Sequence, residues 1–195
     1  MRPESDLPQQ LPTILIPSGT KLMRIHARGR HPLWFGPARG GVPVNRFDDP
    51  RAEFQVCYLG ATIEACFAET FLRNPPVRIL AVGDLARRVV TTIEVRRALH
   101  VAALYGPGLA RLGATAELTG GGDYPLSRAW SRALWAHENH PDGIAYRSRH
   151  DDSALSVALF GRARGALAVL GARSLVDNPQ LLAELLGRYG LALTP

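Results

Sequence analysis

The chain has 195 residues with a hydrophobic share of 46% and a charged share of 21%, which predicts one globular domain, residues 1–195, with a sizeable core. No apolar run approaches the roughly 20 residues of a membrane helix, and residues 1–10 lack the apolar stretch of a signal peptide, so we expect a cytoplasmic protein that does not associate with membranes. The net charge is +6 and every basic residue except Lys21 is arginine, but the arginines are scattered, so direct nucleic-acid binding is not expected.

The N-terminal part combines an irregular segment with a strand. Residues 1–19 are rich in proline and polar residues and predict an extended segment on the surface. The alternation in KLMRIHA, residues 21–27, predicts a strand that places Leu22, Arg24 and His26 on one face. This polar face either meets solvent or contributes to a site.

A loop-rich stretch follows at residues 29–50, in which glycine and proline are frequent. It also carries Trp34, Phe35, Arg46 and Phe47, so it is more than a linker. Aromatic and arginine side chains in a long loop are typical of a wall or lid over a site, although the aromatic residues can equally anchor the loop to the core.

The sequence CYLGATIEACFAETFL, residues 57–72, is the centre of the chain. A short apolar strand with Tyr58 turns at Gly60 into a helix that Thr62 can cap. This helix is apolar on nearly all sides, which indicates burial, and yet it carries Glu69. A desolvated carboxylate costs several kcal/mol unless a cation or donor accompanies it. Glu69 is therefore either a structural acid that reaches water or an arginine, or a functional acid in a cleft.

The remainder of the chain mixes strands and helices without a regular βαβ pattern. Strands are predicted at residues 77–82, 89–93, 144–149, 156–160 and 166–170, and helices at 123–139 and, between Asn178 and Gly190, near the C-terminus. Residues 94–122 give no clear assignment. The fold class is therefore α+β, with a mixed sheet core and flanking helices.

Common catalytic motifs are missing from the sequence. The histidines lack the i, i+4 spacing of a helical metal site, and there is no P-loop, dinucleotide fingerprint or GxSxG elbow, so we expect no metal. Cys57 and Cys66 lie in apolar elements and are expected to be reduced core residues.

Several segments together, in this order, resemble the RES domain family. They are LMRIH, PLWFGP with NRFDDP, VCYLG followed by EACFAETFLR, the helix GDYPLSRAWSRALW, and DGIAYRSRHDDSALSVALF. The resemblance is strongest over residues 20–161, and residues 162–195 add a C-terminal strand and helix. The arginine, glutamate and serine that name the family correspond to Arg24, Glu69 and Ser148, and Arg46 and Tyr58 match further pocket positions.

The resemblance implies a fold similar to that of ADP-ribosyltransferases and a toxin of a type II toxin–antitoxin pair. Such toxins use NAD⁺ as substrate rather than as a recycled cofactor, and an antitoxin with an Xre-like helix-turn-helix domain neutralises them. The implied activity is cleavage of the nicotinamide–ribose bond by hydrolysis or phosphorolysis, as in an NAD⁺ glycohydrolase or phosphorylase. Transfer of ADP-ribose to a protein acceptor is the alternative.

The chemistry of these residue types agrees with that activity. Cleavage passes through an oxocarbenium-like state, which a carboxylate such as Glu69 can stabilise. Arg24 and Arg46 offer planar forks to a pyrophosphate. We expect Arg24, Glu69 and Ser148 to act in catalysis and Arg46, Tyr58 and Tyr124 to bind NAD⁺, with Tyr146 as a rival aromatic contact. The alternative from another class is a basic, non-enzymatic module that binds nucleic acid or another polyanion, with Glu69 structural.

Overall fold

The computed structural model of the protein describes residues 7–37, 40–122 and 124–195. The strands are β1 (Thr13–Ile16), β2 (Lys21–Ala27), β3 (Val56–Gly60), β4 (Ile79–Ala81), β5 (Arg88–Val95), β6 (Leu99–Leu104), β7 (Gly143–Ser148), β8 (Asp151–Phe160), β9 (Leu167–Arg173) and β10 (Ala192–Thr194). The helices are α1 (Ile63–Phe71), α2 (Val82–Ala86), α3 (Pro107–Arg111), α4 (Glu117–Gly120), α5 (Tyr124–Ala136) and α6 (Pro179–Tyr189), with a 3₁₀ segment at Gly161–Ala166.

One eight-stranded sheet organises the molecule, in the order β1-β6-β7-β8-β3-β2-β5-β9. β6 and β7 are parallel, and the other neighbouring pairs are antiparallel. A separate two-stranded parallel sheet joins β4 to β10 near the C-terminus. The mixed sheet with flanking helices confirms the predicted α+β class.

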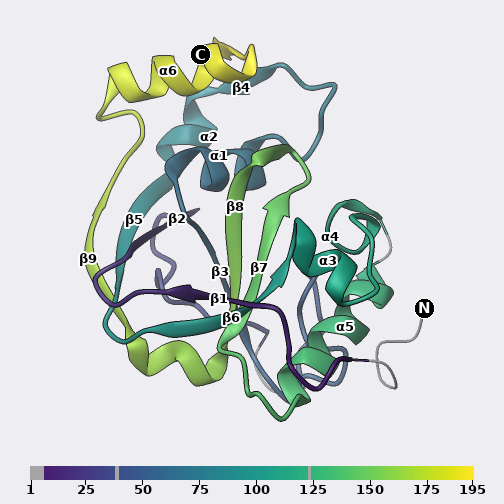
Figure 1. Ribbon diagram of the computed structural model, residues 1–195. Helices are drawn as coiled ribbons and strands as arrows, with labels where there is room; N and C mark the ends of the chain where they lie inside the picture. The colour runs from purple at the N-terminus through teal and green to yellow at the C-terminus, as the bar shows by residue number, and fades with distance from the viewer. Residues whose placement is uncertain (1–6, 38–39, 123) are drawn as a thin grey trace.

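The helices form two groups, which are visible in Figure 1: α1, α2 and α6 lie together at the top, and α3, α4 and α5 at the right. Each group covers a separate cluster of buried residues. The upper cluster includes Ile25, Phe67, Leu85, Val90 and Leu185, and the other includes Phe47, Leu104, Trp130, Ile144 and Phe160. A third cluster is formed by strand residues of the sheet such as Leu22, Cys57, Leu59 and Ile93.

Local sequence accounts for the helix ends. The side chain of Thr62 accepts a hydrogen bond from the backbone N–H of Ala65, as predicted for an N-cap. At α6, Asn178 caps the N-terminus, Pro179 occupies the first turn and Gly190 ends the helix at φ 60°. The leucines of α6 complete the core, since Leu182 and Leu185 are buried in the upper cluster.

The clearest differences from the sequence-based predictions lie in three stretches, while β8 also begins earlier than the predicted residue 156 and α5 ends earlier than the predicted residue 139. Within the N-terminal segment, predicted to lie on the surface, residues 13–16 form β1 on the edge of the sheet, and Leu11 and Ile16 are buried; residues 1–6 lie outside the described residues. The strand predicted at residues 77–82 is limited to β4, because α2 begins at Val82. The unassigned residues 94–122 contain β6, α3 and α4.

The two cysteines are free and buried, as predicted. Burial raises the pKa of the Cys57 thiol to about 11 and that of Cys66 to about 12. Among the described residues, no helix is both long and apolar enough to cross a bilayer.

Candidate active site

A cleft lies where β2 and β3 meet. β2 pairs with β5 along its whole length, whereas Met23 opposite Gly60 is the single paired position between β2 and β3 in the described sheet. Residues of both strands line a cleft of ≈ 800 Å³, together with the loop after β2, helix α1, the start of α5 and the β7–β8 turn. The site therefore occupies a break within the sheet.

The charge of this cleft is strongly unbalanced. Its described lining contains six arginines, Arg24, Arg30, Arg46, Arg73, Arg88 and Arg149, but Glu69 is the single acidic side chain among them. Planar guanidinium groups bind phosphates and carboxylates through paired hydrogen bonds. The cleft is thus suited to an anionic ligand. The arginines can bind the negative groups of the ligand, and the Glu69 carboxylate can act on another part of it.

Glu69 extends from the second half of α1, where it is half-buried. Its carboxylate has no hydrogen bond or ion pair with any residue in the described part of the chain; the backbone oxygen of Glu69 accepts a hydrogen bond from Arg73 Nε at 2.7 Å. Its charge acts on Tyr146, whose pKa is raised first by burial and then by Glu69. The predicted acid therefore lies in the cleft, and its carboxylate is unpaired among the described residues.

Arg24 reaches into the cleft from β2. Its Nη1 donates hydrogen bonds to the carbonyl oxygens of Pro32 and Trp34, both at 2.9 Å, and to Cys57 Sγ at 3.2 Å. All of its hydrogen bonds to described residues use this one nitrogen. Nη2 and Nε are therefore available to a ligand, and the hydrogen bonds of Nη1 fix the orientation of the guanidinium group.

Arg46 is contributed by the loop before β3 and is 8% exposed. Its Nη1 donates to the carbonyl oxygen of Gly121 at 2.7 Å, and its guanidinium lies 4.8 Å from the centre of the Tyr124 ring. Burial lowers the pKa of Arg46, and Glu69 is among the groups that raise it. Arg46 and Tyr124 therefore form one stacked unit in the cleft wall.

Tyr58 presents its ring rather than its hydroxyl. The hydroxyl donates to Asp48 Oδ1 at 2.9 Å and accepts from the backbone N–H of Phe47 at 2.9 Å. Burial and the neighbouring Asp48 charge raise the pKa of Tyr58 well above its ordinary value. The ring is thus the part of Tyr58 that is available to stack against a ligand.

Ser148 is placed differently from the other predicted site residues. It is 1% exposed at the end of β7 and is not part of the cleft lining. Its hydroxyl accepts a hydrogen bond from the backbone N–H of His150 at 3.1 Å. Ser148 thus holds the turn whose next two residues, Arg149 and His150, do line the cleft.

The cleft also contains residues that the sequence did not single out. The β7–β8 hairpin contributes Arg149, His150 and Ser156 to the lining. It also contributes Tyr146, which the sequence offered as an alternative to Tyr58 for the aromatic contact. Burial lowers the pKa of His150. The hairpin register brings Ser156 opposite Tyr146, a pairing that is not visible from sequence spacing because a bulge interrupts it at Arg147.

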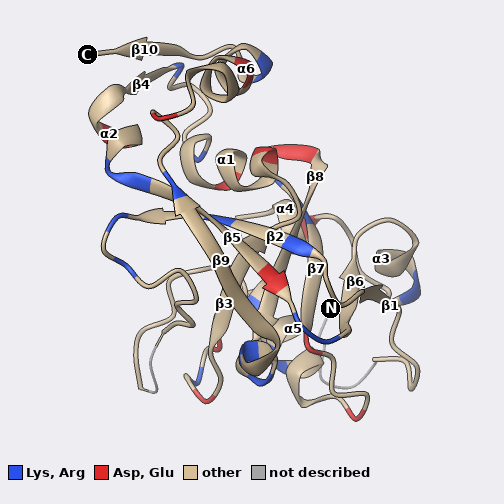
Figure 2. Cartoon of the chain, turned by 90° about the vertical axis from the view of Figure 1, so that its left-hand side faces the viewer, with Lys and Arg blue, Asp and Glu red and all other residues tan. Residues whose placement is uncertain are grey.

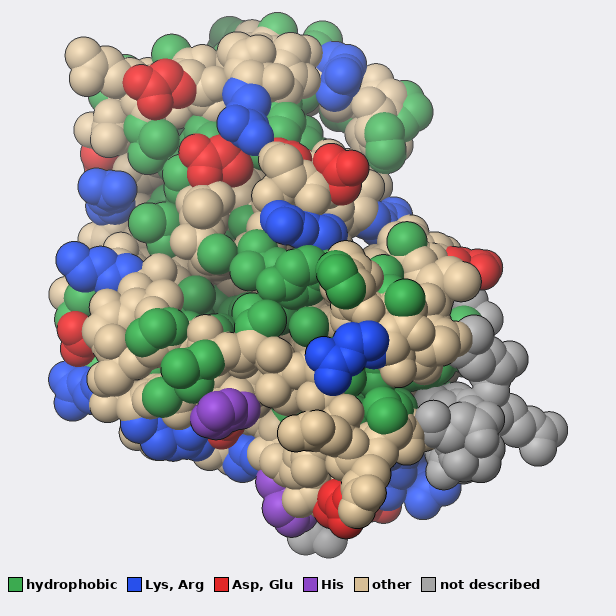
Figure 3. All heavy atoms as spheres, viewed as in Figure 1, with side chains coloured by type: hydrophobic (Ala, Val, Ile, Leu, Met, Phe, Trp, Pro, Cys, Tyr) green, Lys and Arg blue, Asp and Glu red, His purple; other side chains and the backbone are tan. Residues whose placement is uncertain are grey.

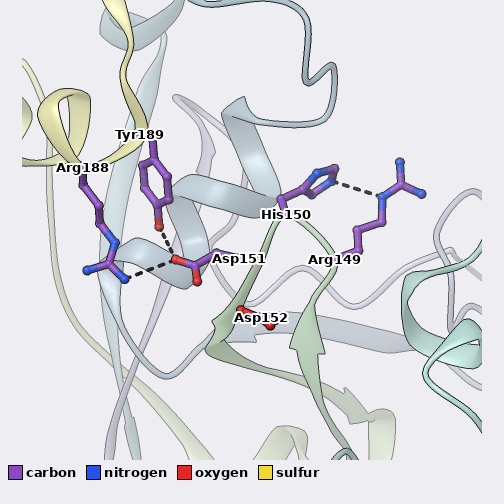
Figure 4. A pocket seen from close by; sticks show the side chains of 6 residues that line it. All are labelled: Arg149, His150, Asp151, Asp152, Arg188 and Tyr189. Atoms are coloured by element: carbon purple, nitrogen blue, oxygen red, sulfur yellow. Dashed lines mark hydrogen bonds and ion pairs between the residues drawn. The ribbon is translucent and has the colours of Figure 1, made fainter.

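A second, shallower hollow of ≈ 630 Å³ adjoins the cleft and shares Arg149 and His150 with it (Figure 4). Here Asp151 Oδ2 accepts hydrogen bonds from the hydroxyl of Tyr189 at 2.8 Å and from Arg188 at 3.4 Å. The hollow therefore lies where the end of α6 is fastened to the β7–β8 hairpin. No group of three or more metal-ligating side chains occurs in the described ranges.

Comparison with known proteins gives consistent matches. The family model described as RES domain matches residues 21–177. The chain is 31% identical over 114 residues to "Probable toxin y4kH" of Sinorhizobium fredii, which spans 58% of this chain and 89% of that protein. The toxin–antitoxin complex MbcT–MbcA of M. tuberculosis contains a chain that shares the fold, with a TM-score of 0.67, 21% identity, and coverage of 89% of this chain and 92% of that one.

Proposed function

The chain belongs to the RES domain family, and we propose that it is the toxin of a toxin–antitoxin pair that cleaves the nicotinamide–ribose bond of NAD⁺. The observation that carries this proposal is Glu69, the one carboxylate in the described lining of the cleft, where it faces six arginines and pairs with none of the described residues. A dinucleotide has a doubly charged pyrophosphate for the arginines and a glycosidic bond on which the carboxylate can act.

The arginines would bind the pyrophosphate. Arg24 and Arg46 lie on opposite sides of the break in the sheet, one on β2 and the other in the loop before β3, and each has its guanidinium fixed by backbone carbonyl oxygens. A preoriented guanidinium loses less conformational freedom when it binds an anion. The rings of Tyr58 and Tyr146 offer apolar faces for a planar base.

Glu69 would act at the ribose. When the C1′–N bond breaks, nicotinamide leaves as a neutral molecule with the bonding electron pair, and positive charge develops on the sugar. A carboxylate held next to that charge stabilises the transition state more than the ground state. An oxygen of water or phosphate then forms the new bond to C1′, and water gives up a proton.

A partner follows from the same comparisons. The solved relative in fold was crystallised as a toxin–antitoxin complex, which supports an antitoxin as partner of this chain. We propose an Xre-like antitoxin and a cytoplasmic site of action, where NAD⁺ is available. A polyanion-binding module is less well supported, because Lys and Arg positions are spread along the chain in Figure 2, and on the face seen in Figure 3 basic side chains occur as separate groups among hydrophobic and acidic ones.

The test is the release of nicotinamide from NAD⁺ by the purified chain, measured by chromatography with and without phosphate. We expect release by the parent and a loss of about 100-fold or more in Glu69→Gln. Glu64→Gln is the matched control, because Glu64 is on the same helix but outside the cleft lining. The product identifies the acceptor as water, phosphate or protein; no release from folded, antitoxin-free chain would contradict the proposal.

A further inference from the structure

The loop formed by residues 43–49 is organised around a buried carboxylate. Asp48 is 0% exposed, and its Oδ2 accepts hydrogen bonds from the backbone N–H of Val44 at 2.9 Å and of Asn45 at 2.7 Å, and from the Asn45 side chain at 3.2 Å. Val44 and Asn45 both line the cleft. One carboxylate oxygen therefore sets the path of the loop at the cleft wall.

The other oxygen of Asp48 connects this loop to β3. Oδ1 accepts the hydrogen bond of the Tyr58 hydroxyl at 2.9 Å, and that hydroxyl in turn accepts from the backbone N–H of Phe47 at 2.9 Å. Arg46 lies between Asn45 and Phe47, so the residues on both sides of it are fixed by the Asp48–Tyr58 pair. The same pair fixes the position of the Tyr58 hydroxyl and with it the direction of the ring axis.

We propose that Asp48 is a positioning residue for ligand binding, one that holds Arg46 and Tyr58 in the geometry that the ligand requires. This inference rests on the proposed function, in which the cleft binds NAD⁺. Asp48 does not itself line the cleft, so it acts through the two residues that do. Preorganised contacts raise affinity because less order has to be created on binding.

The neighbouring Asp49 provides an internal comparison. It is also 0% exposed, but it accepts from the backbone N–H groups of Arg51, Glu53 and Phe54 and forms an ion pair with Arg132 of α5 at 3.0 Å. None of these partners belongs to the cleft lining. Two adjacent carboxylates thus have equal burial and similar numbers of donors, and only Asp48 is connected to the site.

An asparagine at position 48 cannot reproduce both sets of bonds. The amide offers one acceptor oxygen, so its NH₂ group faces either the Tyr58 hydroxyl or the N–H groups of Val44 and Asn45. At position 49 the same change weakens the contact with α5 and with residues 51–54. Both variants lose stability, but only Asp48→Asn loosens the cleft wall.

The experiment compares Asp48→Asn with Asp49→Asn in the full chain, using steady-state kinetics with NAD⁺ and amide hydrogen exchange without ligand. For Asp48→Asn we expect the KM to rise about tenfold or more and kcat to change less, because the substitution disturbs the preorganised binding residues rather than the chemical step. Exchange should accelerate at residues 44, 45 and 47. For Asp49→Asn we expect a KM near that of the parent and faster exchange at residues 51–54. If Asp48→Asn does not fold, Tyr58→Phe keeps the ring but removes the hydroxyl contacts with Asp48 Oδ1 and with the backbone N–H of Phe47, and it should raise the KM in the same way.

The outcomes separate this inference from the proposed function. An active parent with equal KM values in both aspartate variants overturns the positioning role and leaves the function intact. A folded parent that does not cleave NAD⁺ overturns the function, and with it the inference that depends on it. A raised KM in Asp48→Asn alone, together with faster exchange at residues 44, 45 and 47, supports both.

Discussion

Arg24 and Cys57 are joined across the break in the sheet, with Nη1 of the arginine 3.2 Å from the sulfur of the cysteine. The same nitrogen donates to the carbonyl oxygens of Pro32 and Trp34, so the Arg24 guanidinium ties the loop after β2 to β3, beside the backbone bridge between Gly36 and Val56. Arg24 thus has a structural edge and a ligand-binding edge, and these can be separated by substitution.

Lysine at position 24 would retain the positive charge but not the planar guanidinium with its paired hydrogen-bond donors. We expect Arg24→Lys to raise the KM for NAD⁺ by about tenfold or more, because an ammonium group cannot bind the loop carbonyls and the pyrophosphate in the same geometry. Arg28→Lys is the control, since Arg28 follows β2 but lies outside the cleft lining. Equal effects of the two changes on the KM would show that Arg24 contributes charge alone.

The serine predicted for catalysis can be compared with the serine that lines the cleft. We expect Ser148→Ala to reduce turnover by releasing the backbone N–H of His150, which should then exchange faster. Ser156→Ala removes a hydroxyl from the cleft itself and should change the KM instead. Ser153→Ala, at an exposed position in the same hairpin, should change neither. Unchanged turnover in Ser148→Ala would exclude a role for that hydroxyl.

The turn between β3 and α1 requires glycine because of close contacts. A Cβ at Gly60 would lie 2.7 Å from Cys66 Sγ and 2.9 Å from the carbonyl oxygen of Thr62. We expect Gly60→Ala to lower the free energy of unfolding by about 1–3 kcal/mol, measured by urea denaturation. Gly171→Ala in β9, where a Cβ meets nothing within 4 Å, should be close to neutral. A neutral Gly60→Ala would mean that the turn relaxes.

Stability should fall at acidic pH through His26. Its ring donates from Nδ1 to the carbonyl oxygen of Ala27 and accepts at Nε2 from Thr91, so the neutral form is bound. Burial, together with the positive charge of Arg24, lowers the pKa of His26 below 6.5. The unfolded chain therefore takes up the proton first, and the contribution of His26, complete above about pH 6.5, is lost as the pH falls below it. Urea midpoints at pH 7 and pH 5 should differ less in His26→Gln than in the parent.

Much of the fold was predictable because local signals agreed with the final structure. Thr62 and Gly190 marked helix ends through capping chemistry, and the alternation in residues 21–27 identified β2. β6 was missed because Leu99–Leu104 is a nearly continuous apolar run that pairs in parallel with β7, which gives no alternation. β1 was missed because four residues in a proline-rich segment are stabilised by the sheet edge rather than by their own propensity.

The candidate site was predictable in part. Glu69 was identifiable because a carboxylate on an otherwise apolar helix requires an explanation, and the family resemblance located Arg24, Arg46 and Tyr58, all of which line the cleft. Tyr124 lines it as well, next to Arg46. Sequence could not place His150 or Ser156, because their approach depends on how the β7–β8 hairpin folds over α1. It also gave no sign that Asp48 and Asp49 face different neighbours.

The break between β2 and β3 has a mechanical consequence. By strand pairing the sheet consists of two halves, β1-β6-β7-β8-β3 and β2-β5-β9, which are joined by the Met23–Gly60 pair and by a core cluster that includes Leu22 and Leu59. Arg24 belongs to one half and Arg46 to the loop that is anchored on the other, so a molecule bound by both arginines braces the two halves against each other. Occupancy of the cleft should therefore add a connection between the two halves to the core that they already share.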